Sequence, residues 1–290
     1  MSLFVQQHAT PSAFTSAPWV ILTPIEQRIK EKIEAVGTPL KDWDIQINYG
    51  IKTGYNEAFI ISTEKRDEIL ANCQTEEERQ RTADLIRPIL RGRDIKRYGY
   101  DWAGLWLIFI PWHFPYQFDT SINGASEKAE KAFQEQYPSV YQHMTKYKER
   151  LSKRNKAETG IRYEWYAMQR WGAQYWEDFD KPKVVWNRIA SVKQFAFVQE
   201  QMFIQDSMHF IVGSNLTYLC SVLNSKIFQW LLSMIIGDAA GGNAGNANNI
   251  MELSIPPSIQ DEAVDNEYLY SYYNLSEEEI HYIESQVSLL

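Results

Sequence analysis

The chain has 290 residues, enough to bury a full hydrophobic core in one large domain or two small ones. Its hydrophobic fraction of 44% and its 10 tryptophans exclude an intrinsically disordered chain and indicate a packed globular body. The net charge of −8 argues, by itself, against a nucleic-acid partner. The charge is uneven, however. From Glu252 onward there are nine acidic residues and no Lys or Arg, so the remainder carries 29 basic and 28 acidic residues and can present a basic face.

Cysteine usage and hydropathy indicate the compartment. Cys73 and Cys220 form neither a disulfide framework nor a zinc-binding spacing, which favours a reducing cytoplasm. The most apolar segment, Leu216–Ile236, has Asn, Ser and Lys at its centre, which argues against a membrane span. The first fifteen residues lack the basic and apolar regions of a signal peptide. We therefore expect a cytoplasmic protein with no membrane partner.

The N-terminal elements have clear local signals. Residues 1–22 are rich in Ser, Thr, Ala and Gln and are predicted to be a linker or an added leader. Thr23 and Pro24 suit the N-cap and first turn of a helix that ends at Gly37. Alternating apolar residues at 43, 45 and 47 then predict a strand.

That strand leads into the sequence GIKTGYNEAFII at positions 50–61. Two glycines four residues apart permit a tight turn and the close approach of another backbone, and the apolar run after them predicts a short buried strand. The loop presents Lys52, Thr53 and Asn56. On chemistry alone, it is either an ordinary hairpin turn or a loop that contacts a ligand.

The middle of the chain alternates helical and extended patterns. Thr63–Arg87 is charged and helical, Pro88–Tyr98 is irregular and basic, and Leu105–Ile110 is predicted to be a buried strand. Helices are predicted from Ser126 to Gln136 and from Pro138 to Lys156.

The C-terminal part begins with three predicted strands, at Lys183–Ile189, Lys193–Gln199 and Met202–Val212. The last two are expected to form a hairpin around Glu200. Leu216–Ile236 is predicted to be one long core helix, and Gly237–Asn249 a loop of low complexity. An acidic tail with helices at Tyr268–Tyr273 and Ser276–Val287 completes the chain.

Two basic clusters suit contact with nucleic-acid phosphates, which Lys and Arg bind without reading sequence. The first contains Arg87, Arg91, Arg93, Lys96 and Arg97, and the second contains Lys146, Lys148, Arg150, Lys153, Arg154 and Lys156. Glycine and irregular structure among the charges favour a functional interpretation of the first cluster. The second is equally well explained as the solvated face of a helix.

Signals for catalysis are weak. The glycine-rich stretch Gly241–Asn246 lacks the lysine of a phosphate-binding loop and follows a helix, so a small nucleotide-binding enzyme stays a remote alternative. Asp94-Ile95-Lys96 fits only a short form of a nuclease metal-binding pattern. An Asn-Pro-Pro-Tyr-type methyltransferase motif does not occur, and the five histidines are scattered. We predict no catalytic residue and no metal ligand in this chain.

Several stretches, taken in order, resemble the TaqI-like C-terminal specificity domain, the target-recognition domain of type IIG restriction–modification enzymes and adenine-specific DNA methyltransferases. Residues 50–61 resemble its opening motif, and IRPILRGRDIKRY at 86–98 resembles the segment that follows. Further matching stretches are WLIF at 106–109, YPSVYQHM at 137–144, LSKR at 151–154, KPKVVW at 181–186, LNSK at 223–226 and YNLSEEEI at 273–280.

The resemblance implies a sequence-specific DNA recognition module, the C-terminal fragment of a type IIG restriction enzyme or adenine-N6 DNA methyltransferase. It would position double-stranded DNA for methyltransferase and nuclease domains elsewhere in the parent chain, which would use S-adenosylmethionine and Mg; this chain itself would hold no cofactor. A specificity domain of a phage-defence methyltransferase without a nuclease, or a standalone specificity subunit, stays open.

We predict a mixed α/β (α+β) fold of twisted mixed sheets flanked by helices. The expected divisions are a linker at 1–22, a target-recognition domain at 23–258 and an acidic helical tail at 259–290.

Candidate contacts were assigned by side-chain chemistry. Arg suits guanine, and Asn or Gln suits adenine, because each offers paired hydrogen-bonding groups. The candidates for contacts with the DNA backbone are Lys52, Thr53, Arg91, Arg93, Lys96 and Arg97. The candidates for base contacts are Asn56, Arg170, Asn187, Arg188 and Gln194.

Overall fold

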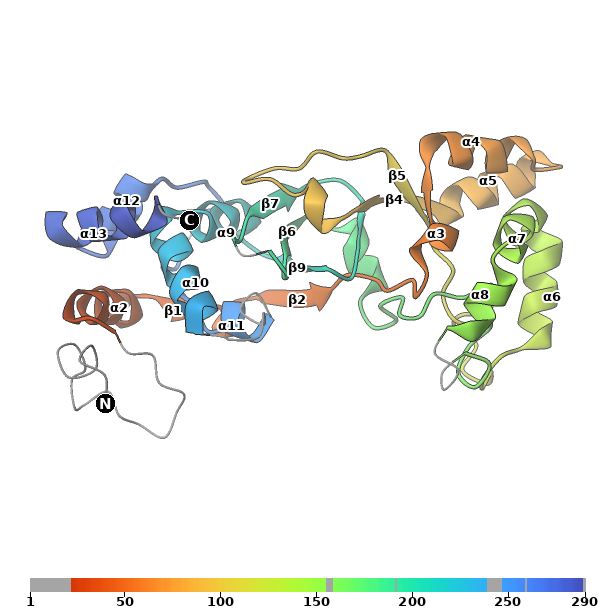
Figure 1. Cartoon of the computed structure of the whole chain (residues 1–290), viewed down its shortest axis with the longest axis horizontal. Coiled ribbons are helices and arrows are strands. Elements are labelled where there is room, and N and C mark those ends of the chain that lie inside the picture. Colours follow the sequence, from red (N-terminus) through yellow and green to blue (C-terminus); the bar gives the residue numbers. More distant parts are fainter. Residues whose placement is uncertain (1–21, 155–158, 191, 239–246, 259, 289–290) are drawn as a thin grey trace.

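The computed structural model describes residues 22–154, 159–190, 192–238, 247–258 and 260–288. The molecule is elongated, with helices at both ends and the larger sheets between them (Figure 1). The fold is mixed α/β, as predicted. No helix in the described ranges is long and apolar enough to cross a membrane.

The helices are α2 (Pro24–Val36), α3 (Asn56–Phe59), α4 (Thr63–Ala71), α5 (Glu76–Leu85), α6 (Glu127–Gln136), α7 (Pro138–Thr145), α8 (Lys148–Lys153), α9 (Leu216–Leu223), α10 (Lys226–Asp238), α11 (Ala247–Met251), α12 (Asn266–Tyr272) and α13 (Glu277–Val287). The strands are β1 (Thr38–Pro39), β2 (Ile45–Tyr49), β3 (Ile60–Ser62), β4 (Ile86–Leu90), β5 (Leu105–Ile108), β6 (Lys183–Asn187), β7 (Phe195–Val198), β8 (Phe203–Ile204), β9 (Met208–Gly213) and β10 (Ser254–Ile255). Short 3₁₀ turns lie at Leu40–Asp42, Gly92–Asp94 and Trp176–Asp180.

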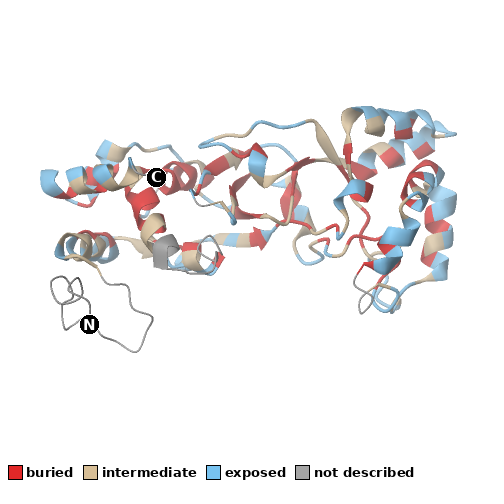
Figure 2. Cartoon of the chain, viewed as in Figure 1, coloured by how far each residue is buried: buried red, intermediate tan, exposed pale blue. Residues whose placement is uncertain are grey.

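The central sheet divides the molecule into two hydrophobic cores. Its strands run antiparallel in the order β2–β9–β6–β7. Successive residues of a strand point to opposite faces. Val185 on β6 therefore packs into one core, whereas its neighbours Val184 and Trp186 pack into the other. Both faces of this sheet are consequently covered, and much of the ribbon of its strands is coloured as buried in Figure 2.

The first core joins the central sheet to a second sheet, of order β3–β5–β4–β8. Leu107 of β5 and Ile89 of β4 are fully buried there, together with Phe133 of α6 and Val140 of α7. Strands β4 and β8 pair in parallel, which connects this sheet to the chain just before β9. The helices α4–α8 occupy the end of the molecule beyond this sheet (Figure 1).

The second core lies at the opposite end and includes the acidic tail. Ile29 of α2, Leu219 of α9 and Trp230 of α10 are buried with Leu269 of α12 and Ile283 of α13. The domain boundaries predicted from the sequence stay predictions, but the tail shares its core with the rest of the chain.

Two predicted elements differ from the structure. The hairpin is formed by β6 and β7, not around Glu200, because the chain after β7 leaves the central sheet and β8 pairs with β4. The helix predicted over Leu216–Ile236 breaks between α9 and α10. There the Asn224 side chain bonds to both backbone groups of Phe195, at 3.1 and 2.7 Å, and the Ser225 hydroxyl accepts from Phe228 N.

Candidate nucleic-acid interface

Four strand termini meet at one end of the central sheet. The C-terminal ends of β2 and β6 pair with the start of β9, through Tyr49–His209 and Asn187–Met208, and the end of β6 pairs with the start of β7. The segments that leave β2 and β6 and enter β7 therefore lie side by side. We call the solvent-facing part of this region the sheet-end surface. Its polar residues are the half-buried Lys52 and Asn187 and the exposed Asn56, Arg93, Lys96, Arg170, Arg188 and Gln194.

The glycine loop is seated against the turn that precedes β9. Gly50 N donates to Met208 O at 3.0 Å, and a Cβ at Gly50 would lie 2.0 Å from Gln205 O, so only glycine fits. Two residues further on, Lys52 and Arg170 exchange backbone hydrogen bonds of 2.9 Å in both directions. This exchange brings together two candidates that are 118 positions apart in sequence.

Thr53 was assigned to the DNA backbone, but the structure does not leave it available for that contact. It is only 2% exposed, and its hydroxyl donates to Asn56 Oδ1 at 2.6 Å. Asn56 itself is exposed at the start of α3. The hydroxyl of Thr53 therefore orients the amide of Asn56, which keeps its nitrogen for another partner.

The first basic cluster divides into paired and available cations. Arg91 donates to both carboxylate oxygens of Asp94, at 3.1 and 2.8 Å, and this pairing raises the pKa of Arg91. Arg97 donates to the carbonyl of Asn224. Both side chains thus have internal partners, and their assignment to the DNA backbone stays a prediction. Lys96 is exposed and 3.9 Å from Asp101, and Arg93 is exposed with no side-chain partner among the described residues.

This arginine-rich segment packs along the central sheet. A Cβ at Gly92 would lie 2.4 Å from Asn187 Nδ2, so glycine allows the segment to approach the end of β6. Tyr98 N donates to Phe195 O at 2.8 Å and extends the sheet past β7. Arg93 and Lys96 are thereby held close to the base-contact candidates.

The turn between β6 and β7 carries three of those candidates. Asn187 Oδ1 accepts from Ile189 N at 3.0 Å, and the exposed Arg188 donates through Nε to Asp206 O at 3.3 Å. Lys193, which sequence reasoning did not single out for a role within the turn, is buried, and its ammonium donates to the carbonyls of Arg188 and Ala190. Burial lowers the pKa of Lys193 to about 8. Gln194 is exposed beside it.

Arg154 is the second residue whose role sequence reasoning missed. It was counted in the second basic cluster, but only 8% of it is exposed. Its guanidinium donates to the carbonyls of Leu151, Trp165 and Ala167 at 3.1, 2.7 and 2.7 Å, and to that of Thr53. Burial lowers the pKa of Arg154 to about 10. It ties the glycine loop to the segment that leads to Arg170. Lys156 of the same cluster lies outside the described residues.

His209 lies under the sheet-end surface. Its ring centroid is 4.5 Å from that of Tyr49 and 5.3 Å from that of Trp186. The residue is 1% exposed, and neither ring nitrogen has a hydrogen-bond partner among the described residues. Burial, with Arg188 and Lys193 nearby, lowers the pKa of His209 to about 4, so the ring is neutral at pH 7.

Acidification should therefore destabilise the chain through His209. The unfolded chain binds a proton on this ring near pH 6.5, whereas the folded chain binds it only near pH 4. The neutral His209 ring makes its full contribution to the free energy of unfolding above pH 6.5. As the pH drops from 6.5 to 4, that free energy falls by about 3 kcal/mol. His209→Leu should lose less stability between pH 7 and pH 4 in urea denaturation, with His281→Gln as the control at an exposed histidine. Equal losses in wild type and His209→Leu would contradict the assignment.

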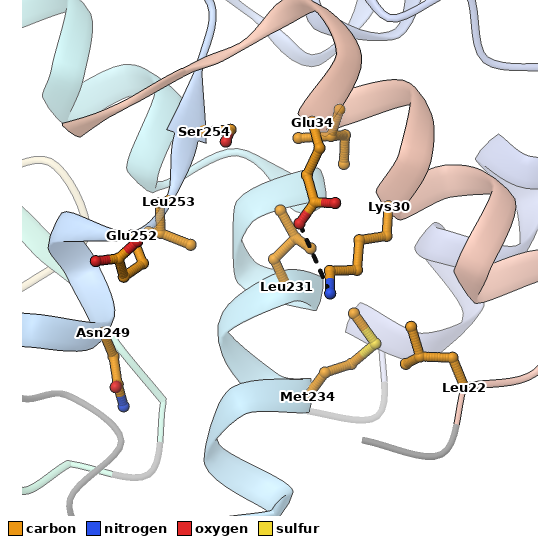
Figure 3. Close-up of a pocket in the computed structure, with 10 residues that line it drawn as sticks. Leu22, Lys30, Glu34, Leu231, Met234, Asn249, Glu252, Leu253 and Ser254 are labelled. Atoms are coloured by element: carbon orange, nitrogen blue, oxygen red, sulfur yellow. Dashed lines mark ion pairs between the residues drawn. The ribbon is translucent and has the colours of Figure 1, made fainter. Parts of the chain in front are cut away.

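A pocket at the other end of the molecule is separate from this surface. It has a volume of about 230 Å³ and lies between α2, α10 and the segment around β10 (Figure 3). Leu231, Met234 and Leu253 line it, and the ion pair between Lys30 and Glu34, 3.6 Å long, lies at its side. None of the candidate residues contributes to it. The glycine-rich stretch Gly241–Asn246 lies outside the described residues.

Comparison with known proteins identifies a family for this chain. The family model of the TaqI-like C-terminal specificity domain matches residues 87–244, more than half of the chain. The fold and the match define a DNA target-recognition module. The chain belongs to the TaqI-like C-terminal specificity domain family.

Two restriction enzymes are among the solved structures that this chain matches. One is the type IIL restriction-modification enzyme MmeI in complex with DNA, with 14% identity, a TM-score of 0.39, and coverage of 65% of this chain and 21% of MmeI. The other is the type IIG restriction endonuclease BpuSI, with 13% identity, a TM-score of 0.46, and coverage of 87% of this chain and 28% of BpuSI. This chain thus spans about a quarter of their length. No curated protein sequence matches it.

Proposed function

We propose that this chain binds double-stranded DNA through the sheet-end surface and selects the target sequence for catalytic domains of a parent protein. One observation carries the proposal: segments distant in sequence bring Lys52, Arg170 and Arg188 to one end of the central sheet, beside Asn187. Cations next to exposed amides combine phosphate binding with base reading, which is what sequence-specific binding of DNA requires.

The residues of this surface fall into two groups, one for contacts with the DNA backbone and one for contacts with the bases. Lys52, Arg93 and Lys96 are the cations of the backbone-contact set that are not held by a close internal partner. The base-reading set keeps all five predicted members: Asn56, Arg170, Asn187, Arg188 and Gln194. Internal contacts orient several of these side chains before DNA binds, which lowers the entropy that binding loses.

The parent protein we propose is a type IIG restriction enzyme with adenine-N6 DNA methyltransferase activity, in the cytoplasm. Its catalytic domains would supply S-adenosylmethionine and Mg sites, and this chain would contribute recognition alone. A phage-defence methyltransferase without a nuclease, or a standalone specificity subunit, would use the same surface. The reading frame upstream of residue 1 distinguishes these architectures.

Substitutions at the two sets of residues should have different effects on DNA binding. Arg93→Ala or Lys96→Ala should weaken binding to all duplexes alike and reduce the salt dependence by about one unit. Arg188→Ala or Arg170→Ala should cost roughly 1–3 kcal/mol on the selected site, relax one base position and change binding to random DNA little. Lys131→Ala, at an exposed lysine of α6, is the control.

The measurement is a competition assay of each variant across a library of duplexes at two salt concentrations. If the Arg93 and Lys96 variants change sequence preference while the Arg188 and Arg170 variants do not, the two assignments are inverted. If neither pair changes DNA binding relative to the Lys131 variant, the sheet-end surface is not the DNA-binding surface.

A further inference from the structure

The most exposed apolar side chain at the sheet-end surface is Ile189. It follows β6 in the turn to β7 and is 66% exposed, directly after Arg188. A single exposed isoleucine needs no explanation in general. Ile189 differs because polar candidates for base contact flank it on both sides of the turn, Asn187 and Arg188 before it and Gln194 after it.

The turn holds Ile189 in place. Its amide donates to Asn187 Oδ1 at 3.0 Å, and the carbonyls on either side, of Arg188 and Ala190, both accept from the buried ammonium of Lys193. A β-branched side chain also has few rotamers to lose on contact. Ile189 is therefore an exposed apolar group held in the turn that joins β6 and β7 at the end of the four-stranded sheet.

The chemistry of this turn fits one feature of DNA. The apolar group that the major groove displays is the C5-methyl of thymine. Guanine, adenine and cytosine offer hydrogen-bonding groups in the same place, which the flanking Asn, Arg and Gln side chains suit. An isoleucine between such side chains would distinguish thymine from cytosine by contact with its methyl group.

We propose that Ile189 is a specificity-determining residue that contacts the C5-methyl group of a thymine in the target site. This inference rests on the proposed function, since it requires that the sheet-end surface bind the major groove. It adds an apolar contact to a set of base-reading residues that sequence reasoning chose by hydrogen-bonding capacity alone.

The test pairs a protein change with removal of a single methyl group from DNA. Duplexes selected from a random pool by the wild-type chain define the bound site, and each thymine in that site is then replaced by deoxyuridine. One replacement should weaken wild-type binding about three- to fivefold, the effect of one buried methyl group. Ile189→Ala should bind the thymine duplex more weakly and lose the difference between thymine and uracil at that position only.

Ile161→Ala is a matched control, because Ile161 is 67% exposed in the segment between Thr159 and Tyr163 and belongs to no part of the sheet-end surface. It should retain the wild-type uracil pattern. If Ile189→Ala also retains that pattern, or weakens binding to every duplex alike, the thymine contact is wrong although DNA recognition stands. If the wild-type chain selects no sequence from the pool, the proposed function fails as well.

Discussion

Deleting residues 260–290 should unfold the chain. The tail carries Leu269, Tyr270, Tyr273 and Ile283, all buried in the second core. Burying one large apolar side chain contributes roughly 1.5–3 kcal/mol, so losing four removes about as much as the whole stability of a typical domain. Thermal unfolding followed by circular dichroism should show no cooperative transition, or one far below that of the full chain.

A charge-only variant separates the packing of the tail from its acidity. Glu262, Glu267 and Glu277 are exposed and have no ion pair within the described residues, so the triple change to Gln removes three negative charges without touching the core. Because α12 and α13 lie at one end of the molecule whereas the tip of β2 lies near its middle (Figure 1), DNA affinity should stay within twofold at physiological salt. For the deletion of residues 260–290, a cooperative transition near the unfolding temperature of the full chain would contradict the expectation, because it would show that the tail folds apart from the second core.

Local signals predicted the local elements. The helix α2 begins and ends where Thr23-Pro24 and Gly37 predict, because an N-cap, a proline and a terminating glycine act through their immediate neighbours. Thr23 and Glu26 form a full capping box there, with bonds of 3.4 and 2.7 Å. The helices of the acidic tail were found in the same way.

Pairing between distant segments could not be predicted in this way. A periodic apolar pattern identifies a strand but not its partner, so the hairpin was placed one strand too late. The long apolar run at 216–236 gave no sign of the break between α9 and α10, because that break depends on a hydrogen bond from the Asn224 side chain to a strand 29 positions away. Charge counting likewise cannot distinguish Arg154, buried among carbonyls, from the exposed Arg150 one turn earlier.

Two internal pairs at the candidate site had a visible signal in the sequence. Arg91 and Asp94 are three residues apart, as are Thr53 and Asn56, and both pairs are bonded. Spacing of this kind marks a cation or hydroxyl that is already engaged within its own turn. The composition of the first basic cluster shows that its side chains can bind phosphates. Whether each side chain is available to do so depends on these internal pairs.

Replacing Arg154 with Met should weaken DNA binding indirectly, because Arg154 is buried and holds the glycine loop against the segment that leads to Arg170. The apolar part of the side chain is kept, but the carbonyls of Trp165 and Ala167 lose the guanidinium as donor. Those of Leu151 and Thr53 keep backbone donors, Arg154 N at 3.2 Å and Gln169 N at 3.4 Å. Each unpaired buried acceptor costs about 1–3 kcal/mol, so we expect a net loss of about 2–5 kcal/mol of stability. Below the unfolding temperature, the Thr53 and Ala167 segments should separate, so that Lys52 and Arg170 no longer sit together.

Hydrogen exchange and DNA binding measure these two effects separately. The amides of Lys52 and Arg170, which bond to each other's carbonyls at 2.9 Å, should exchange faster in Arg154→Met, and affinity should fall at least tenfold on selected and random duplexes alike. Arg154→Lys should restore part of both, because an ammonium can serve some of the carbonyls. Arg79→Met, at an exposed arginine of α5, is the control and should change neither. If Arg154→Met binds DNA as the wild type does while its two amides stay protected, the buried guanidinium does not position the glycine loop.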